Sequence, residues 1–286
     1  MSRLQEVALE RRAMSTIVNL TSVFEGIASM RIAQTKNQVL QSQQFFKELW
    51  QIYSQLRVDT LFRYGRNESE KVIDKQLFIV ITSEGGFSGD IDQKLIKSML
   101  ETYDPAKQDI IVIGHHGAVQ LIQAGVSFKK YFTLPSKDRN INVQPLINEV
   151  RRYKDTIVYY QTYVSLMVQE VKNIDLSSAV KQEAQGVAAK EKKDEYISEA
   201  TYIFEPSTFD VAAHLERSMM QIALSQVILD SKLAQYASRF RAMSMAKDRA
   251  NDLHSNLGIL YNRTKRRIQD ERLKEMINGL RKTGVS

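Results

Sequence analysis

The sequence predicts an α/β protein in which a long antiparallel coiled coil of the N- and C-terminal helices carries a small Rossmann-like α/β domain. Both ends of the 286-residue chain are poor in helix-breaking residues, and all four prolines lie between 105 and 206. Long helices are expected where such residues are scarce. In the middle of the chain, β-rich runs alternate with helical patterns, which is typical of a partly parallel sheet.

Composition narrows the class of protein. The chain is 43% hydrophobic and 26% charged, and it has no cysteine, which excludes disulfides, thiolate metal sites and cysteine nucleophiles. It has no apolar stretch of about 18 residues, so no membrane span is expected. The N-terminus "MSRLQEVALERR" lacks the apolar region of a secretory signal, and its glutamates argue against an organelle transit peptide. Residues 239–286 hold 12 Lys and Arg against 5 Asp and Glu, which accounts for the whole net charge of +7.

Residues 1–58 are predicted to form the N-terminal helix of the coiled coil. Apolar residues recur there at helical spacing, and the pattern changes phase near 28–36, where large apolar residues are scarce. The apolar positions are Leu4, Val7, Met14, Ile17, Leu20, Phe24, Ile27, Val39, Phe46, Leu49, Ile52 and Leu56.

Residues 72–205 are predicted to form the Rossmann-like domain. Helical patterns cover 90–102 and "HHGAVQLIQAG" (115–125), and the stretch 177–198 is polar and is interpreted as an insertion. Strands are expected at "QLFIVIT" (76–82), "DIIVIG" (109–114), "TIVYYQTYVSLMV" (156–168) and "ATYIFEPS" (200–207).

Residues 208–286 are predicted to form the long C-terminal helix of the coiled coil. The helical pattern runs from about Val211 to Leu280, which at about 1.5 Å per residue gives a helix on the order of 100 Å long. No compact domain of this size buries such a rod, so it is expected to pair with the N-terminal helix and to project beyond it. A heptad seam, which predicts left-handed supercoiling, is expected at Met243, Ala246, Ala250, Leu253, Leu257 and Leu260.

The stretch "FIVITSEGGFSGDID" (78–92) begins like a nucleotide-binding fold, with a buried strand, a glycine-rich turn and a helix. It lacks the lysine and hydroxyl that end a Walker loop, and its glycines do not have GxGxxG spacing. Three carboxylates around the turn, Glu84, Asp90 and Asp92, would repel phosphate. We therefore predict a structural turn that holds no nucleotide and no other cofactor.

No catalytic or metal-binding constellation is evident in the sequence. His115 and His116 follow a strand without Asp, Glu or further His at ligand spacing, which favours a polar pair in a loop. Nothing resembles a Ser/His/Asp site or paired catalytic carboxylates, which disfavours a free-standing nucleotide-dependent enzyme. A nucleic-acid binder would interleave its basic residues with aromatic ones, and after Arg239 the only aromatic residues are Phe240 and Tyr261.

Four stretches of the sequence together match the pattern of a known protein family. They are "VITSEGGFSGDID" (80–92), "YIFEPS" (202–207), "YASRFRAMSMAKDRANDL" (236–253) and "LGILYNRTKRRIQDERLKEMINGL" (257–280). In this order, across about 260 residues, they resemble the gamma subunit family of F-type ATP synthases. The chain departs from the family pattern at Glu25 and Gly26, where relatives have lysine and alanine. Further departures are Glu84, Gly85, Lys265, Arg266 and Arg267, so the resemblance is to a diverged member.

The resemblance implies a non-catalytic subunit, the rotating central stalk, which couples rotation driven by ion flow to ATP synthesis. It implies that the coiled coil enters a catalytic hexamer of alpha and beta subunits. The α/β domain would form a foot against an epsilon- or delta-type stalk subunit and the membrane rotor c-ring. The implied location is peripheral, on the cytoplasmic face of the bacterial inner membrane or, less often, the matrix face in organelles. The alternative is the shaft of a diverged rotary ATPase that powers other work, such as motility or export.

The resemblance also suggests which residues meet these partners. Contact with the hexamer is expected at Arg263, Lys265, Arg266, Arg267, Met276, Ile277, Ile17, Leu20 and Phe24. Contact at the foot and ring is expected at Glu84, Phe87, Tyr202 and Glu205. The basic cluster, defined as Arg263, Lys265, Arg266 and Arg267, either meets acidic loops of the hexamer or is an ordinary solvated helix face.

Overall fold

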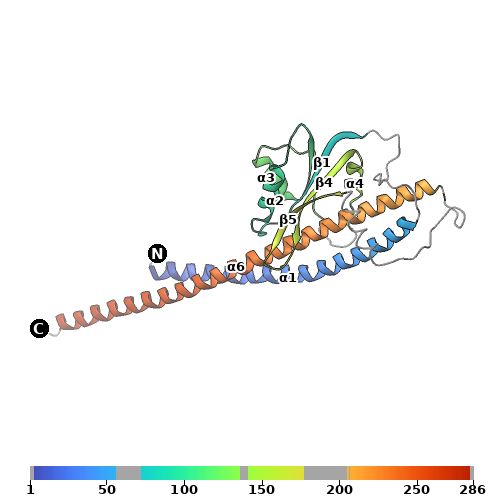
Figure 1. Ribbon diagram of the computed structural model, residues 1–286. Coiled ribbons are helices and arrows are strands. Elements are labelled where there is room, and N and C mark those ends of the chain that lie inside the picture. Colours follow the sequence, from blue (N-terminus) through green and yellow to red (C-terminus); the bar gives the residue numbers. More distant parts are fainter. Residues whose placement is uncertain (1–2, 56–71, 136–140, 177–204, 206, 284–286) are drawn as a thin grey trace. The chain divides into compact units, whose positions relative to one another are not determined.

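The computed structural model describes residues 3–55, 72–135, 141–176, 205 and 207–283. In chain order, two long helices, α1 (Arg3–Gln55) and α6 (Thr208–Thr283), flank a five-stranded sheet (Figure 1). The chain divides into two compact units. Met1–Ile27 and Phe240–Ser286 form the coiled-coil unit, and Ala28–Arg239 form the sheet unit.

The sheet unit contains a doubly wound, mostly parallel sheet. The strands lie in the order β3-β2-β1-β4-β5, and only β5 runs antiparallel to its neighbour. The connections therefore change direction between β1 and β4, and in such folds ligands usually bind at this switch point, beyond the carboxyl ends of the strands. The strands are β1 (Ile73–Ile81), β2 (Gln108–Ile113), β3 (Lys130–Phe132), β4 (Tyr153–Tyr163) and β5 (Gln169–Asp175).

Helices cover both faces of the sheet, which explains why its central strands are apolar without interruption. On one face, α2 (Ile91–Leu100) and α3 (His115–Gln123) pack against a core that includes Phe78. On the other face, α4 (Gln144–Val150) and the first half of α6 pack against a core that includes Ile79 (Figure 1). Neighbouring residues of β1 thus point to opposite layers, as the pleat of a strand requires.

Helix α6 begins at a serine N-cap. The Ser207 hydroxyl accepts a hydrogen bond from the Asp210 N–H at 3.1 Å and donates one to the Asp210 carboxylate at 2.7 Å. A serine in this position typically stabilises a helix by about 1 kcal/mol. The cap explains why a helix of 76 residues starts here.

In the coiled-coil unit, α1 and α6 run antiparallel. Arg11 lies beside Gly258, whereas Glu25 forms an ion pair with Lys247, so numbers rise along one helix as they fall along the other. The less exposed residues include a set whose spacing fits the seven-residue repeat of a left-handed coiled coil on both helices. Its members are Leu4, Val7, Met14, Val18, Thr21 and Glu25 on α1, and Met243, Lys247, Ala250, His254, Leu257, Tyr261, Thr264 and Ile268 on α6.

The seam of α6 differs from the predicted one. Leu253 and Leu260, expected in the seam, are 51% and 39% exposed, while His254 and Tyr261 are partly buried in their stead. The predicted and the observed seam both contain Met243, Ala250 and Leu257. At the positions between them, the more apolar residues were predicted to face α1, and the structure has their neighbours there instead. The ion pair of Lys247 with α1 belongs to the observed seam.

The predicted phase change in α1 is also wrong. Val7, Met14, Thr21, Ala28 and Thr35 follow one another at intervals of seven, and all are buried except Met14, which is half-buried. Small and polar side chains thus continue the seam where large apolar ones are missing. The large apolar residues just before this stretch, Phe24 and Ile27, are exposed and lie outside the seam.

The sheet departs from the prediction in its last strands. The expected strand 156–168 is too long, because β4 ends at Tyr163 and a turn follows in which the N–H groups of Val164 and Ser165 donate to the carbonyl of Val168. The apolar composition of this turn conceals it in the sequence. The next strand, β5, begins only at Gln169 and was not predicted. The short elements β3 and α4 are further additions to the predicted set. The expected strand 200–207, apart from Glu205 and Ser207, and the insertion 177–198 lie outside the described residues.

Candidate functional site

The glycine-rich turn, residues 82–90, follows β1 at the switch point of the sheet. Phe87 and Gly89 have φ angles of 67° and 68°, so the chain reverses tightly there. Gly114, after β2, has φ 100°, and a Cβ at this position would lie 2.1 Å from the Thr82 carbonyl oxygen. Only glycine therefore allows the ends of β1 and β2 to approach as they do.

Helix α6 lies against this turn. The Ser238 hydroxyl donates to the carbonyl of Ser88 at 2.6 Å. The Arg239 guanidinium donates to the carbonyls of Gly85 and Gly86, each at 3.1 Å. The turn is thus held by hydrogen bonds to a helix that is about 150 residues away in the sequence.

One turn earlier, α6 contacts the end of β4. The Gln161 side-chain oxygen accepts hydrogen bonds from the Ser231 hydroxyl at 2.5 Å and from the Gln235 amide at 3.4 Å. Gln161 can reach α6 because β1 pairs with β4 only as far as Tyr159. We call the hydrogen bonds of α6 to Gln161 and to the glycine-rich turn the helix–turn joint.

Asp92 supplies the negative charge at the start of α2, where folds of this type often hold an anion. Its side chain is 4% exposed and accepts hydrogen bonds from the N–H and the hydroxyl of Ser83 and, at 2.8 Å, from the Gln161 amide. The Nδ1 atom of His116 lies 3.4 Å from the Asp92 carboxylate. The protein's own carboxylate therefore takes the place of a bound anion, and Gln161 connects it to α6.

The turn has the opposite polarity to a phosphate-binding loop. Phosphate loops present backbone N–H groups, whereas this turn presents three carbonyl oxygens to donors on α6. Burial lowers the pKa of the Arg239 guanidinium, although Tyr236 and Asp92 favour its charged form, and arginine stays charged in proteins. The geometry suits an internal cation and agrees with the predicted structural turn.

Sequence reasoning missed most of the residues at this joint. His115 and His116 begin α3, as the helical pattern of 115–125 predicted, so their interpretation as a pair in a loop is wrong. The carboxylate beside His116 comes from α2, 24 positions earlier. Linear spacing cannot reveal such a neighbour. A signal did exist on α6, where Ser231, Gln235 and Ser238 recur at helical spacing within a segment that is largely buried.

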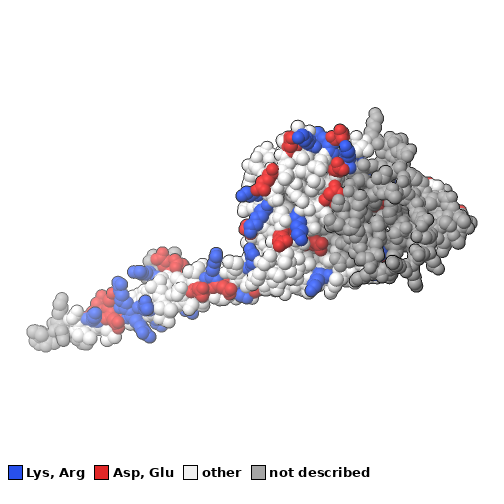
Figure 2. All heavy atoms as spheres, viewed as in Figure 1, with Lys and Arg blue, Asp and Glu red and all other residues white. Residues whose placement is uncertain are grey.

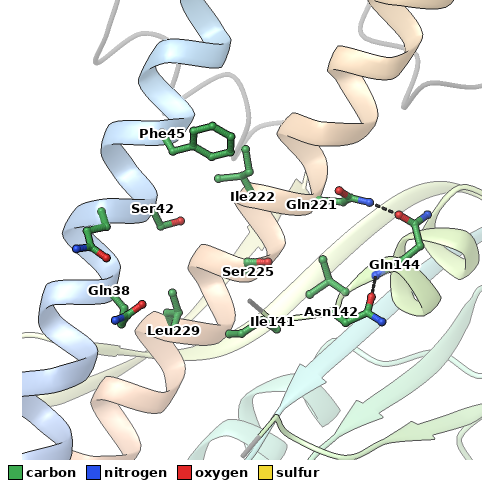
Figure 3. Close-up of a pocket in the computed structure, with 12 residues that line it drawn as sticks. Gln38, Ser42, Phe45, Ile141, Asn142, Gln144, Gln221, Ile222, Ser225 and Leu229 are labelled. Atoms are coloured by element: carbon green, nitrogen blue, oxygen red, sulfur yellow. Dashed lines mark hydrogen bonds between the residues drawn. The ribbon is translucent and has the colours of Figure 1, made fainter. Parts of the chain in front are cut away.

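A cavity of about 560 Å³ lies elsewhere in the sheet unit (Figure 3). Gln221 of α6 donates to the Gln144 side chain at its edge, and the Gln144 N–H donates to Asn142 at 3.1 Å. The lining consists of Gln38, Gln41, Ser42, Phe45, Ile141, Asn142, Val143, Gln144, Gln221, Ile222, Ser225 and Leu229. These described residues carry no charge, so the cavity offers no ionic partner for a phosphate group.

Comparison with known proteins decides the family. A family model described as ATP synthase matches residues 3–281, nearly the whole chain. The chain belongs to the ATP synthase family. The ATP synthase gamma chain of Chloroherpeton thalassium is 26% identical, with 98% of this chain and 97% of the relative covered. The gamma chain of Clostridium novyi is 21% identical, with 96% of each covered.

Solved structures share the fold. A chain of the Euglena gracilis mitochondrial ATP synthase, in a structure of OSCP, F1 and c-ring in rotational state 3, matches with a TM-score of 0.62 and 14% identity. The match covers 96% of this chain and 94% of that one. A chain of the rotor from the same organism matches with a TM-score of 0.58. Together with the family and the names of the relatives, the chain is a gamma-type, non-catalytic central-stalk subunit of an ATP synthase.

The residues predicted to meet the hexamer lie outside the seam of this gamma-type chain. On α1, Ile17, Leu20 and Phe24 are 39%, 53% and 36% exposed. On α6, Met276 and Ile277 are 60% and 47% exposed. These side chains therefore form exposed apolar stripes on both helices of the coiled-coil unit.

The basic cluster is exposed as well. Figure 2 shows Lys and Arg, with Asp and Glu among them, along the C-terminal part of α6. Within the cluster, Arg267 forms an ion pair with Glu271 at 3.0 Å. Among the described residues, Arg263, Lys265 and Arg266 have no acidic partner within ion-pair distance. The cluster thus keeps three positive charges available to another molecule.

The predicted foot contacts divide into two groups. Glu84 is only half-buried, but its carboxylate accepts a hydrogen bond from the Leu134 N–H and another from the Tyr131 hydroxyl at 3.4 Å, so it holds two segments of the sheet unit together. Phe87 is 63% exposed and Glu205 is exposed. Tyr202 lies outside the described residues.

Two classes of function receive no support from the described residues. No helix among them is long and apolar enough to cross a membrane. Within the same part of the chain, no group of three or more His, Cys, Asp or Glu is placed to hold a metal ion.

Proposed function

We propose that the coiled-coil unit turns inside a hexamer of alpha and beta subunits, and that the sheet unit sits against an epsilon- or delta-type subunit and a membrane rotor ring. In this role the chain couples ion flow to ATP synthesis and is held peripherally at the cytoplasmic face of a bacterial inner membrane. Family membership and the names of the relatives support the proposal. The observation that carries it is the exposed apolar surface of the coiled-coil unit.

That surface is too apolar for a rod that remains in water. On α1, Ile17, Leu20, Phe24 and Ile27 recur at spacings of three and four, and all are at least 36% exposed. They lie on a different side of the helix from the seam residue Thr21, which is 7% exposed. Contiguous exposed apolar patches usually mark sites where other proteins bind. A sleeve of other chains would cover this one.

The C-terminal end of α6 points to the same conclusion. All residues from 269 to 279 are exposed, including Leu273, Met276 and Ile277, which share one face. An isolated helix of about 12–15 residues is marginal in water, and most helices depend on packing of an apolar face. The stripe of Leu273, Met276 and Ile277 therefore fits a partner that encloses the tip.

The sides of the coiled-coil unit differ in chemistry, which supports a rotary mechanism. The α1 stripe is apolar, whereas the basic cluster on α6 carries positive charge. Each beta subunit would meet a different side at each angle of rotation. Differential contacts of this kind shift the balance between open and closed conformations of each catalytic subunit.

Co-purification tests the proposal. The tagged full-length chain, expressed with its native operon, is expected to bring down alpha- and beta-type subunits, identified by mass spectrometry. Leu20→Asp with Phe24→Asp places two charges on the α1 stripe and is expected to reduce recovery of the hexamer at least about tenfold, because a buried unpaired charge costs several kcal/mol.

Asn19→Asp with Ser22→Asp is the matched control. It adds the same charge to exposed positions of α1 outside both the stripe and the seam, and it should leave recovery unchanged. Recovery of the parent chain without alpha and beta subunits would contradict the proposed function. Equal loss in both double variants would contradict the role of the stripe.

A further inference from the structure

Helix α6 occupies the crevice at which doubly wound sheets usually bind a ligand. The crevice lies beyond the carboxyl ends of β1 and β4, where the strand order changes direction. Ser231 and Gln235 meet Gln161 on the β4 side, and Ser238 and Arg239 meet the glycine-rich turn on the β1 side. A segment of the protein's own long helix therefore stands where a nucleotide would otherwise bind.

The residues of the helix–turn joint lie on one side of α6. Ser231, Gln235, Ser238 and Arg239 have the spacing i, i+4, i+7 and i+8, which brings them within about one third of the helix circumference. They extend over about 12 Å of the helix axis, at about 1.5 Å per residue. The contacts thus grip two successive turns of α6 and do not form a single pivot.

The joint is buried and directional. Ser231, Gln235 and Ser238 are at most 3% exposed, and Gln161 is fully buried. Hydrogen bonds weaken steeply when their angles change, and a buried polar group that loses its partner is costly. The hydrophobic effect is itself non-directional, so it depends less steeply on a small rotation. Rotation of α6 about its own axis would therefore be resisted mainly by the joint and much less by the neighbouring apolar contacts of Leu224.

Asp92 strengthens this resistance. Its buried carboxylate depends on the Gln161 amide at 2.8 Å, while the oxygen of the same amide serves α6. If α6 rotates, the oxygen of the Gln161 side chain loses the hydrogen bonds that Ser231 and Gln235 donate. The Gln161 amide is then no longer held in the orientation in which it donates to Asp92. Buried networks of this kind favour one arrangement because a partly satisfied network is unfavourable.

We propose that the helix–turn joint is the element that transmits torque between the sheet unit and the shaft helix, with Gln161 as the positioning residue. This inference rests on the proposed function, since it assigns the place where rotation of the foot becomes rotation of α6. In this proposal, the crevice that binds a ligand in other folds of this type instead holds α6 and prevents it from rotating against the sheet.

The first experiment measures rotational freedom in the full-length chain. The natural chain has no cysteine, so spin labels can be attached through Gln93→Cys on α2 and His214→Cys on α6, both exposed positions. The distance distribution between the labels is recorded for the parent, for Gln161→Met and for Leu224→Ala. Gln161→Met is expected to widen the distribution about twofold, because the directional contacts are lost. Leu224→Ala, which removes buried apolar contacts from the same helix, should leave the width close to that of the parent.

The second experiment measures torque. In the reconstituted complex, a probe on the sheet unit reports angular fluctuations relative to the fixed hexamer. Gln161→Met is expected to lower the torsional stiffness about twofold while ATP hydrolysis by the hexamer is retained, whereas Leu224→Ala keeps the stiffness. If Gln161→Met does not fold, Ser238→Ala removes a single hydroxyl from the joint and is measured in the same way.

Unchanged label distances and unchanged stiffness in both joint variants would overturn the inference. Equal effects of Leu224→Ala and Gln161→Met would overturn it too, because the joint would then be no more than part of the packing. Failure of the parent chain to assemble with alpha and beta subunits would instead contradict the proposed function, and the spin-label measurement would still decide whether the joint fixes the rotation of α6.

Discussion

At the residue scale, the charged side chains near the C-terminus fall into two groups. Arg267 is paired with Glu271 on its own helix, four residues away, as is common on solvated helices. Arg263 and Arg266 share a face of α6, and the described residues offer them no such partner. Like charges so close repel modestly, so these two do not stabilise the helix. They are the members of the basic cluster that suit an acidic partner.

We expect Arg263→Ala with Arg266→Ala to leave the chain folded and to lower torque or assembly, by on the order of 1 kcal/mol per contact at low salt. The effect should shrink as ionic strength rises, because salt screens exposed charges. Hydrolysis rate and single-molecule torque of the reconstituted complex at low and high salt provide the measurement. Lys94→Ala with Lys97→Ala removes the same charge from α2 as a control. A double variant that matches the parent at both salt concentrations would show that the cluster is a solvated face.

At the scale of single elements, the register of the coiled coil is decided by a few small and polar residues. Ala250 is 4% exposed in the seam, and Leu253, three residues later, is 51% exposed. The sequence pattern predicted that both residues lie in the seam. The small side chain of Ala250 is the one that is buried, and the larger side chain of Leu253 is left exposed.

The two registers make opposite predictions for a pair of substitutions. Ala250→Leu should destabilise the coiled coil by about 1–3 kcal/mol, because it overfills a packed position. Leu253→Ala should change the free energy of unfolding by less than about 0.5 kcal/mol, as is usual for exposed sites. Urea unfolding of the full-length chain, followed by helical circular dichroism, measures both. If Leu253→Ala is the more damaging change, the seam runs through Leu253 as the apolar pattern indicated.

At the scale of the whole molecule, the protein's own groups lie where folds of this type usually bind a nucleotide. The crevice is occupied by α6, its anion position is occupied by Asp92, and its turn presents carbonyl oxygens. Each of these three features alone would weaken phosphate binding, and together they disfavour it strongly.

The isolated full-length chain is therefore expected to show no ATPase activity and no micromolar affinity for Mg-ATP. Calorimetric titration should give only heats of dilution, and addition of Mg-ATP should leave the melting temperature unchanged, because a ligand that binds only the folded state would raise it. A stoichiometric binding isotherm would contradict the assignment of residues 82–90 as a structural turn.

The sequence by itself determined the long terminal helices and the α/β middle, and its charges predict a turn that is unfavourable for phosphate. Helix breakers, strand propensity and charge are local properties, and the carboxylates near Gly85 and Gly86 can be counted without a structure. The short elements β3 and α4 were not predicted, because a few residues give little periodic signal. The turn after Tyr163 was not predicted because its residues are mostly apolar.

Only the tertiary structure decided the seam and the joint. Whether Leu253 or His254 faces α1 depends on the side chains of the other helix, such as Glu25, which pairs with Lys247. Gln161 and Ser231 are 70 residues apart, and no sequence pattern around either residue identifies the other as its partner. Hydrogen bonds between distant segments arise only once burial has brought the segments together, and for that physical reason the contacts that position the shaft helix could not be predicted from the chain alone.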